Sequence, residues 1–558
     1  METNHDAPLT NRKINPQDSI LALTHILFAF GALALGGFAG LLQGVVKATN
    51  FKLPAGIGYY QLLTAHGVLM ALVFTTFFIV GFLYAGAAYT TGGSMRPGVR
   101  RANWWGFGLM AGGTIMTVIM ILLNQASVLY TFYAPLKASP FFYLGLTLVV
   151  VGSWISGIGL FVQYAHWRKQ NPGKLSPLFL FMAVVTMTMW LICTLGVAAE
   201  VLLLLLPWSM GWVPTVNVML SRTLFWYFGH PLVYFWLLPT YICWYVVIPK
   251  LIGGKVFSDS LARLSFILLL LFSIPVGFHH QLTEPGISPV WKFIQVVLTF
   301  MVVVPSLMTA FSLFAMLELS GRAKGAKRLF GWLGKLPWKD ARFFAPFMGM
   351  VIFIPAGAGG IVNASNQMNQ VVHNTIWVTG HFHLTVATSV ALTFFGLMYW
   401  LVPLLSGRKL TPAMNKLGLA QTWIWVIGMF LMSGSMHAVG LLGSPRRTAY
   451  TTYGDHADAL SWIPLHRVLG MGGVILFIGI ILIIYIILEL AFFAEKDTAG
   501  EEDFQVAEVA EDAHATPALL ENWKVWVGIV VILILFAYTI PVLDMLRDVP
   551  GSKPWVTW

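Results

Sequence analysis

Long apolar runs recur along the entire 558-residue chain, and they restrict its fold more than any other feature. A helix needs about 20 apolar residues to cross the hydrocarbon core of a bilayer. Thirteen runs of about that length can be marked, at 17–45, 58–88, 103–124, 141–166, 177–206, 219–249, 261–281, 291–317, 343–361, 375–404, 418–443, 466–494 and 522–546. They predict an all-α membrane protein with about thirteen transmembrane helices, from about residue 17 to 546, in a single domain over residues 1–558.

Composition and charge agree with this class. Hydrophobic residues make up 58% of the chain and charged residues only 10%, against roughly 25% charged residues in an average soluble domain. The net charge of +11 is concentrated in every second loop, most clearly in 318–342. Because cytoplasmic loops carry the excess of Lys and Arg, the N-terminus is predicted to be cytoplasmic and the C-terminus external. Topology thus accounts for the positive charge, and nothing favours a nucleic-acid partner.

The two cysteines exclude several kinds of redox centre. Cys193 and Cys243 each stand alone inside an apolar run, with no CxxC pair, no CxxCH haem attachment and no disulfide framework. Any iron or copper bound by this chain must therefore have nitrogen or oxygen ligands.

Histidines inside the apolar runs carry the functional argument, because a polar imidazole in hydrocarbon is costly unless it has a partner. His381 and His383 are two residues apart, which is about 200° of helical rotation, so their imidazoles leave opposite faces of one helix. One helix can therefore ligate two separate metal centres. For the isolated His25, His166 and His437, a hydrogen bond to a neighbouring helix is the preferred interpretation.

Three further histidines can bind another metal. His279 and His280 are adjacent on the predicted seventh helix, where Pro275 should loosen the backbone hydrogen bonding. His230 is followed one helical turn later by Tyr234, so the two rings share a face. Three neutral imidazoles without a thiolate suit copper or zinc. A deep membrane position with a phenol nearby favours redox-active copper.

Several motifs together resemble the signatures of the haem–copper oxidase superfamily. They are LLTAHGVLMAL in the second predicted helix, GHPLVY in the sixth, an HH pair after a proline in the seventh, HNTIWVTGHFH in the tenth, and SPRR after the eleventh. The match covers the whole chain, and it is closest to subunit I of the B-type branch, the cytochrome ba-type oxidases of bacteria and archaea. This resemblance implies a terminal oxidase of the cell membrane that reduces dioxygen to water.

The resemblance also implies cofactors and their ligands. The helices would surround two haems, a low-spin haem of B type and a high-spin haem of A or O type, and one copper ion. His66 and His383 would be the axial ligands of the low-spin haem, and His381 would hold the high-spin haem. The copper ligands would be His230, His279 and His280.

Further residues acquire roles from the same resemblance. Tyr234 would be the catalytic phenol, which in the family is covalently joined to the copper ligand one turn before it. A phenol can supply an electron and a proton when the O–O bond breaks. The haem propionates would be bound by Arg446, Arg447 and His373.

Electrons and protons need routes to such a site. The family receives electrons through a subunit II with a two-copper thiolate centre, which two isolated cysteines cannot form. The resemblance therefore implies a subunit II partner that is fed by cytochrome c or a similar donor, although a quinol-fed oxidase remains open. Six polar residues match the single proton path of the B-type family, through which pumping would also run: Tyr234, Tyr241, Tyr245, Ser258, Ser306 and Thr309. The alternative is that these side chains serve only in helix packing.

Departures from other branches narrow the choice. Leu232 stands where many A-type relatives have Glu, and the loop TTGGSMRPGVRRANW has no acid, so their second proton path is not expected. Asn374 stands where they have Asp, which argues against a metal site there. A C-type oxidase would carry its tyrosine on a different helix. A nitric oxide reductase would have iron, buried glutamates and no such tyrosine, and a secondary transporter would not need six histidines in this arrangement.

Overall fold

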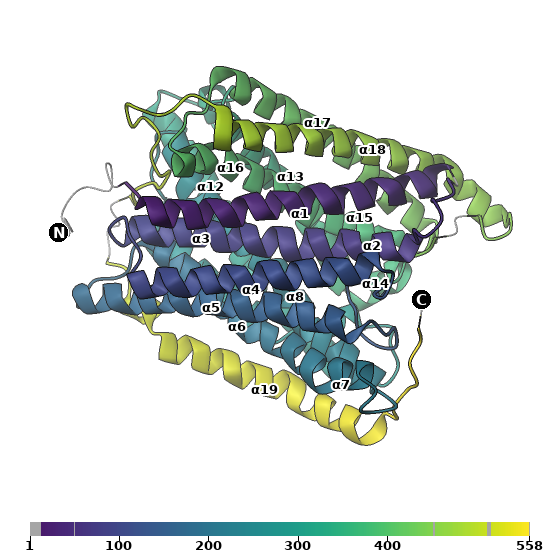
Figure 1. Cartoon of the computed structure of the whole chain (residues 1–558). Helices are drawn as coiled ribbons and strands as arrows, with labels where there is room; N and C mark the ends of the chain where they lie inside the picture. Colours follow the sequence, from purple (N-terminus) through teal and green to yellow (C-terminus); the bar gives the residue numbers. More distant parts are fainter. Residues whose placement is uncertain (1–12, 50, 450–451, 511–514, 557–558) are drawn as a thin grey trace.

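The computed structural model describes residues 13–49, 51–449, 452–510 and 515–556. Apolar helices make up the described chain, and its only β-bridges are isolated (Figure 1). Twelve described spans are long and apolar enough to cross a membrane: α1 (Pro16–Thr49), α2–η1–α3 (Tyr59–Thr90), α4 (Pro97–Leu122), α5 (Pro140–Gln170), α6–η2–α7 (Leu178–Ser209), α8–η3–α9 (Val218–Leu251), α11–α12 (Pro289–Ala323), α13 (Ala341–Ala364), α15–η6–α16 (Ile376–Ser406), α17 (Pro412–Leu441), α18–η7 (Ala457–Phe493) and α19 (Trp523–Asp548). The predicted all-α membrane fold is confirmed.

The remaining predicted span is shorter than expected. Its helix, α10 (Asp259–Ser273), has 15 residues instead of covering 261–281. The helix ends at Ser273, just before Pro275, because proline has no backbone N–H to continue the helical hydrogen bonding. His279 and His280 therefore lie in the 3₁₀ turn η4 (Phe278–His280) and not on a helix. The prediction that this helix continues to residue 281 and carries His279 and His280 was wrong.

Another predicted helix, 291–317, is interrupted. A turn at Met301 and Val302 separates α11 (Pro289–Phe300) from α12 (Val303–Ala323). Short helices complete the described chain: η5 (Gly331–Lys335), α14 (Asn366–Val372) and η8 (Ala518–Glu521).

Wide π-helical turns occur within several spans, in two cases directly after a histidine that the sequence singles out. η1 (Val68–Phe74) begins two residues after His66, and η6 (Thr385–Val390) begins two residues after His383. Turns of this kind are rare and often lie at functional sites. The others are η2 (Glu200–Leu205), η3 (Cys243–Val247) and η7 (Glu489–Phe493).

The helices run roughly along one common direction (Figure 1). The spans α8–η3–α9 and α15–η6–α16 are the most buried, whereas α19 lies along one edge and α17 and α18 lie together along the opposite edge. α1 begins at one end of the bundle and α19 finishes at the other (Figure 1). The two spans that carry His230, His381 and His383 thus form the centre of the molecule.

Candidate metal and haem site

Three of the predicted metal ligands meet at one point. His230 lies on α8, and His279 and His280 lie in η4. One nitrogen atom from each ring lies within 4.8 Å of the other two, and no acidic or cysteine side chain of the described residues joins this group. The centroid of the His230 ring is 4.2 Å from that of His279 and 5.6 Å from that of His280. The three rings can therefore ligate a single ion, and neutral imidazoles suit copper or zinc.

Neighbouring side chains fix two of these rings. Thr299 Oγ1 lies 3.1 Å from Nδ1 of His279, which leaves the other ring nitrogen for a metal. The indole of Trp226 stacks on His280, with ring centroids 4.0 Å apart and an interplanar angle of 8°. Nε2 of His280 is buried and has no hydrogen-bond partner in the described chain. Such a nitrogen is costly to bury alone, and a metal ion would satisfy it.

Tyr234 lies one turn after His230 on α8, as the sequence predicts. The two ring centroids are 4.9 Å apart, with an angle of 65° between the planes. Nε2 of His230 is buried without a hydrogen-bond partner in the described chain. The phenol ring therefore lies beside the three-histidine group.

His381 and His383 on α15 face different neighbours. The ring of His383 is nearly parallel to that of His66 on α2, with centroids 6.1 Å apart and an interplanar angle of 8°. Two metal–nitrogen bonds of about 2 Å each, together with the two half-rings, account for that separation. The ring of His381 instead lies beside Trp377, and its Nδ1 is 2.5 Å from the position that a Cβ on Gly359 of α13 would occupy. This geometry agrees with the prediction that the two imidazoles leave opposite faces of one helix.

The tautomers of the facing pair suit a metal between them. Nδ1 of His66 is 2.9 Å from the carbonyl oxygen of Gly36, and Nδ1 of His383 is 2.8 Å from that of Thr379. Since a carbonyl only accepts hydrogen bonds, each Nδ1 carries the proton and each Nε2 is a free ligand. Gly40 makes room for this arrangement, because a Cβ there would lie 2.7 Å from Nδ1 of His66.

The predicted propionate-binding residues gather in loops near the ends of α14 and α17. Arg446 donates to Oδ1 of Asn374 at 3.0 Å, and Arg447 donates to the Tyr133 hydroxyl at 3.1 Å. His373 lies with its Nδ1 3.0 Å from Oδ1 of Asn369. Nε of Arg446 and Nη2 of Arg447 are buried without a partner in the described chain.

This region has an excess of positive charge. Burial and the neighbouring Arg447 guanidinium lower the pKa of Arg446 to about 10. Burial, and then the charge of Arg446, lowers the pKa of His373 to about 4. Carboxylates such as haem propionates would satisfy the unpaired guanidinium nitrogens and relieve the repulsion between them.

Most of the predicted proton-path residues form hydrogen bonds with one another. The Tyr241 hydroxyl donates to Ser306 Oγ at 3.5 Å, and the Tyr245 hydroxyl donates to Thr309 Oγ1 at 3.1 Å. Tyr245 also lies 3.4 Å from Ser265 Oγ on α10, a residue that the sequence analysis missed.

Ser258 is not part of this hydrogen-bonded set. Its Oγ accepts a hydrogen bond of 3.3 Å from the backbone N–H of Leu261 and so caps the start of α10. Ser265 lies seven residues later, inside α10.

Comparison with known proteins agrees with this geometry. Residues 20–475 match the family model described as cytochrome c and quinol oxidase polypeptide I. The chain is 43% identical over 547 residues to cytochrome c oxidase subunit 1 of Thermus thermophilus, covering 96% of each chain. The chain belongs to the subunit I family of haem–copper oxidases.

Other relatives extend the comparison. The chain is 24% identical to quinol oxidase subunit 1 of Bacillus subtilis, over 86% of this chain and 73% of the relative. A solved structure titled as a haem–copper terminal oxidase dimer superposes with a TM-score of 0.91 at 38% identity, covering 97% of this chain and 95% of the other. This oxidase subunit therefore shares both the sequence and the architecture of the family.

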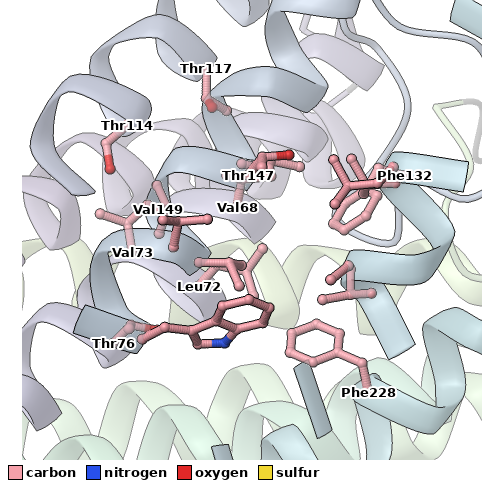
Figure 2. Close-up of a pocket in the computed structure, with 18 of the residues that line it drawn as sticks. Val68, Leu72, Val73, Thr76, Thr114, Thr117, Phe132, Thr147, Val149 and Phe228 are labelled. Atoms are coloured by element: carbon pink, nitrogen blue, oxygen red, sulfur yellow. The ribbon is translucent and has the colours of Figure 1, made fainter. Parts of the chain in front are cut away.

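An apolar cavity opens between several spans, with Phe132, Thr147 and Phe228 among the residues that line it (Figure 2). Phe228, two residues before His230, forms part of its wall, and so does Leu202, which is 47% exposed on the outer surface of the bundle. The hydroxyls of Thr114 and Thr147 bond back to carbonyls of their own helices, which leaves the wall apolar. Sequence analysis missed this cavity, because its lining comes from five separate spans without a common pattern.

A nearby acid of the oxidase subunit is already paired. Glu284, four residues after His280, forms an ion pair with Arg222 and accepts a hydrogen bond of 3.1 Å from Gln281. The guanidinium of Arg222 in turn stacks on Tyr133, 4.8 Å from the ring centre. Glu284 is thus held by these contacts and does not belong to the three-histidine group.

Proposed function

We propose that this oxidase subunit is the catalytic subunit of a terminal oxidase that reduces dioxygen to water, and that it belongs to the B-type branch. The observation that carries the proposal is a three-histidine group with Tyr234 one turn from His230 and no acidic ligand. A phenol at that place can supply an electron and a proton to the reacting oxygen. A nitric oxide reductase, the nearest alternative, would need acidic groups there and no phenol.

The ligands are assigned as follows. We assign the low-spin haem, of B type, to His66 and His383, and the high-spin haem, of A or O type, to His381. We assign one copper ion to His230, His279 and His280. When bound, the haem irons and the copper supply electrons and the place at which dioxygen reacts. Residues 1–558 act as one functional unit.

The chain's own side chains orient these groups. Thr299 holds the tautomer of His279, and Gly36 does so for His66, so that each ring presents a free nitrogen. Arg446 and Arg447 offer unpaired guanidinium nitrogens to the haem carboxylates. His373 lies near Arg446, whose charge helps to lower the pKa of His373.

Protons reach the site along the hydrogen-bonded side chains of α8, η3 and α12. Tyr245 and Thr309 form the bond farther from the metal site, Tyr241 and Ser306 form the nearer one, and Tyr234 is the final donor. Ser258, which caps the start of α10, is assigned to the cytoplasmic end of this path. Proton pumping would use the same path, because Leu232 offers no acid for a second one.

Dioxygen is assigned to the apolar cavity. It is an apolar molecule that concentrates in lipid, and the cavity wall includes both the exposed Leu202 and Phe228, which lies two residues before His230 on α8. A polar path for protons and an apolar path for oxygen would keep the two reactants separate until they meet at the metals.

Electrons are proposed to arrive from cytochrome c through a subunit II with a two-copper centre. Both cysteines of this chain are free, buried and on different helices, so they cannot form that centre. The complex is assigned to the plasma membrane of a bacterium or archaeon, with the N-terminus cytoplasmic. A quinol donor is the alternative, since relatives of both kinds match the chain.

The decisive experiment is haem extraction and metal analysis of the purified complex, followed by turnover assays. We expect two haems and one copper in this chain, in addition to the copper of subunit II, and oxygen uptake with reduced cytochrome c. A single haem, or non-haem iron in place of the copper together with nitric oxide reduction, would overturn the proposal. Oxygen uptake with a quinol but not with reduced cytochrome c would change only the proposed electron donor.

A further inference from the structure

A buried lysine near the end of α1 has no acidic partner. Lys47 is 8% exposed, and its ammonium group donates a hydrogen bond of 2.9 Å to the carbonyl of Thr448. The same ammonium lies 5.9 Å from the centre of the Tyr59 ring. Within the described chain, Lys47 makes no ion pair with an Asp or Glu. An ammonium group buried with so few partners is costly, and an anion beside it would offset that cost.

Lys47 stands two helical turns beyond the residues that hold His66. Gly40, against which the His66 ring packs, is seven residues before Lys47 on α1. Tyr59 is likewise seven residues before His66 on α2. Seven residues amount to two turns, so each pair lies on one helix face and about 10 Å apart along the helix axis. Lys47 and Tyr59 therefore meet above the edge of the space between His66 and His383.

The carbonyl that Lys47 binds belongs to the loop with the unpaired arginines. Thr448 follows Arg447 directly in the sequence. The loop is also held at Ser444, whose Oγ lies 3.3 Å from Nε2 of His466 on α18. Lys47 thus adds a buried positive charge to the same end of the site as Arg446 and Arg447.

We propose that Lys47 is a third cation for the carboxylates of the low-spin haem, beside Arg446 and Arg447. This assignment rests on the proposed ligation of that haem by His66 and His383. The simpler alternative is that Lys47 only ties α1 to the loop, as a lysine favoured near a helix C-terminus. The two roles differ in their effect on the midpoint potential of the low-spin haem. A nearby positive charge favours the reduced haem and so raises its potential, whereas a hydrogen bond that only links α1 to the loop does not.

Three substitutions and a matched control separate these roles. Lys47→Met removes the charge and keeps the apolar stem, while Lys47→Gln also keeps a donor for the Thr448 carbonyl. Lys47→Arg keeps the charge. Lys52→Met makes the same charge change at an exposed position five residues later.

The measurement is a redox titration of the low-spin haem absorbance in the purified complex. We expect Lys47→Met and Lys47→Gln to weaken reduction of that haem about tenfold, which is a fall of about 59 mV in midpoint potential for one electron. Lys47→Arg and Lys52→Met should leave the potential unchanged. If the complex with Lys47→Met does not assemble, the potential measured in Lys47→Gln alone tests the charge role.

Two other outcomes are distinct. A normal low-spin haem whose potential shifts no more in Lys47→Gln than in Lys52→Met would overturn the Lys47 assignment and leave the proposed function intact. Absence of a bis-histidine haem from the unmodified complex would overturn the proposed function itself, and the Lys47 assignment with it.

Discussion

Replacing Tyr234 by Phe would test the proposed chemistry most directly. Phe keeps the ring that lies 4.9 Å from His230 and removes only the hydroxyl. That hydroxyl forms no hydrogen bond within the described chain, so its removal leaves no buried partner unsatisfied. Because the main cost of deleting a hydrogen-bonding group comes from the partner left behind, we expect a stability change below about 1 kcal/mol.

The expected effect on turnover is much larger. A positioned proton donor contributes roughly 10²–10⁴-fold to a reaction rate, and here the same group also provides an electron. Steady-state oxygen uptake should therefore fall at least about 100-fold, which corresponds to about 2.7 kcal/mol in the activation free energy. The assay is oxygen uptake with excess reductant, beside a copper determination and a carbon monoxide difference spectrum. The reduced high-spin haem should still bind carbon monoxide.

Tyr227→Phe is the matched control, because Tyr227 lies seven residues earlier on the same helix and donates a hydrogen bond of 3.4 Å to the carbonyl of Ile192. It should leave oxygen uptake near normal. Near-normal uptake in Tyr234→Phe, with full copper occupancy, would refute the catalytic role of the phenol. It would also remove the main reason for preferring oxygen reduction over nitric oxide reduction. Slow uptake with copper lost would instead assign Tyr234 to orienting His230.

The other expectations concern protons and haem. Thr309→Val removes the acceptor that lies 3.1 Å from the Tyr245 hydroxyl, so it should slow oxygen uptake at least about tenfold with unchanged haem spectra. Leu232→Ile, the control, should have little effect. Normal uptake in Thr309→Val would mean that these hydroxyls serve only in helix packing. His66→Ala should remove the low-spin haem and leave the copper content unchanged, measured by haem extraction and metal analysis; retention of both haems would show that His66 is not a ligand. Gly40→Val places a Cβ 2.7 Å from Nδ1 of His66, so the low-spin absorbance should decrease while carbon monoxide binding persists, and an unaltered spectrum would contradict the proposed packing.

Much of the fold could be predicted because apolar runs of membrane length leave few alternatives. Twelve predicted spans correspond to the described ones, and the facing of His381 and His383 followed from helical rotation alone. The error at 261–281 had a local cause. A continuous apolar run looks helical throughout, yet α10 ends at Ser273, before Pro275, and the two histidines lie in η4.

The parts of the site that escaped prediction depend on contacts between separate helices. Thr299 reaches His279 from α11, and Ser265 reaches Tyr245 from α10. No spacing rule within one helix indicates such partners. Gly40 is different, since it lies four residues after Gly36 and thus on the same face of α1. Two small residues at that interval could have indicated a helix face on which another group packs closely.

The charges of the chain also depend on what it binds. Only the family resemblance singles out Arg446 and Arg447 in the sequence, whereas the structure shows that their guanidinium groups have buried nitrogens without a described partner. Lys47 lies next to the same loop, and its ammonium also lacks a carboxylate from the described chain. Repulsion among three buried cations opposes folding unless anions are nearby. The haem carboxylates would supply those anions, so haem binding should stabilise this end of the bundle as well as provide the redox centre. Because a cofactor can balance charge that is unbalanced within the protein, we expect the haem carboxylates to lie beside these three cations.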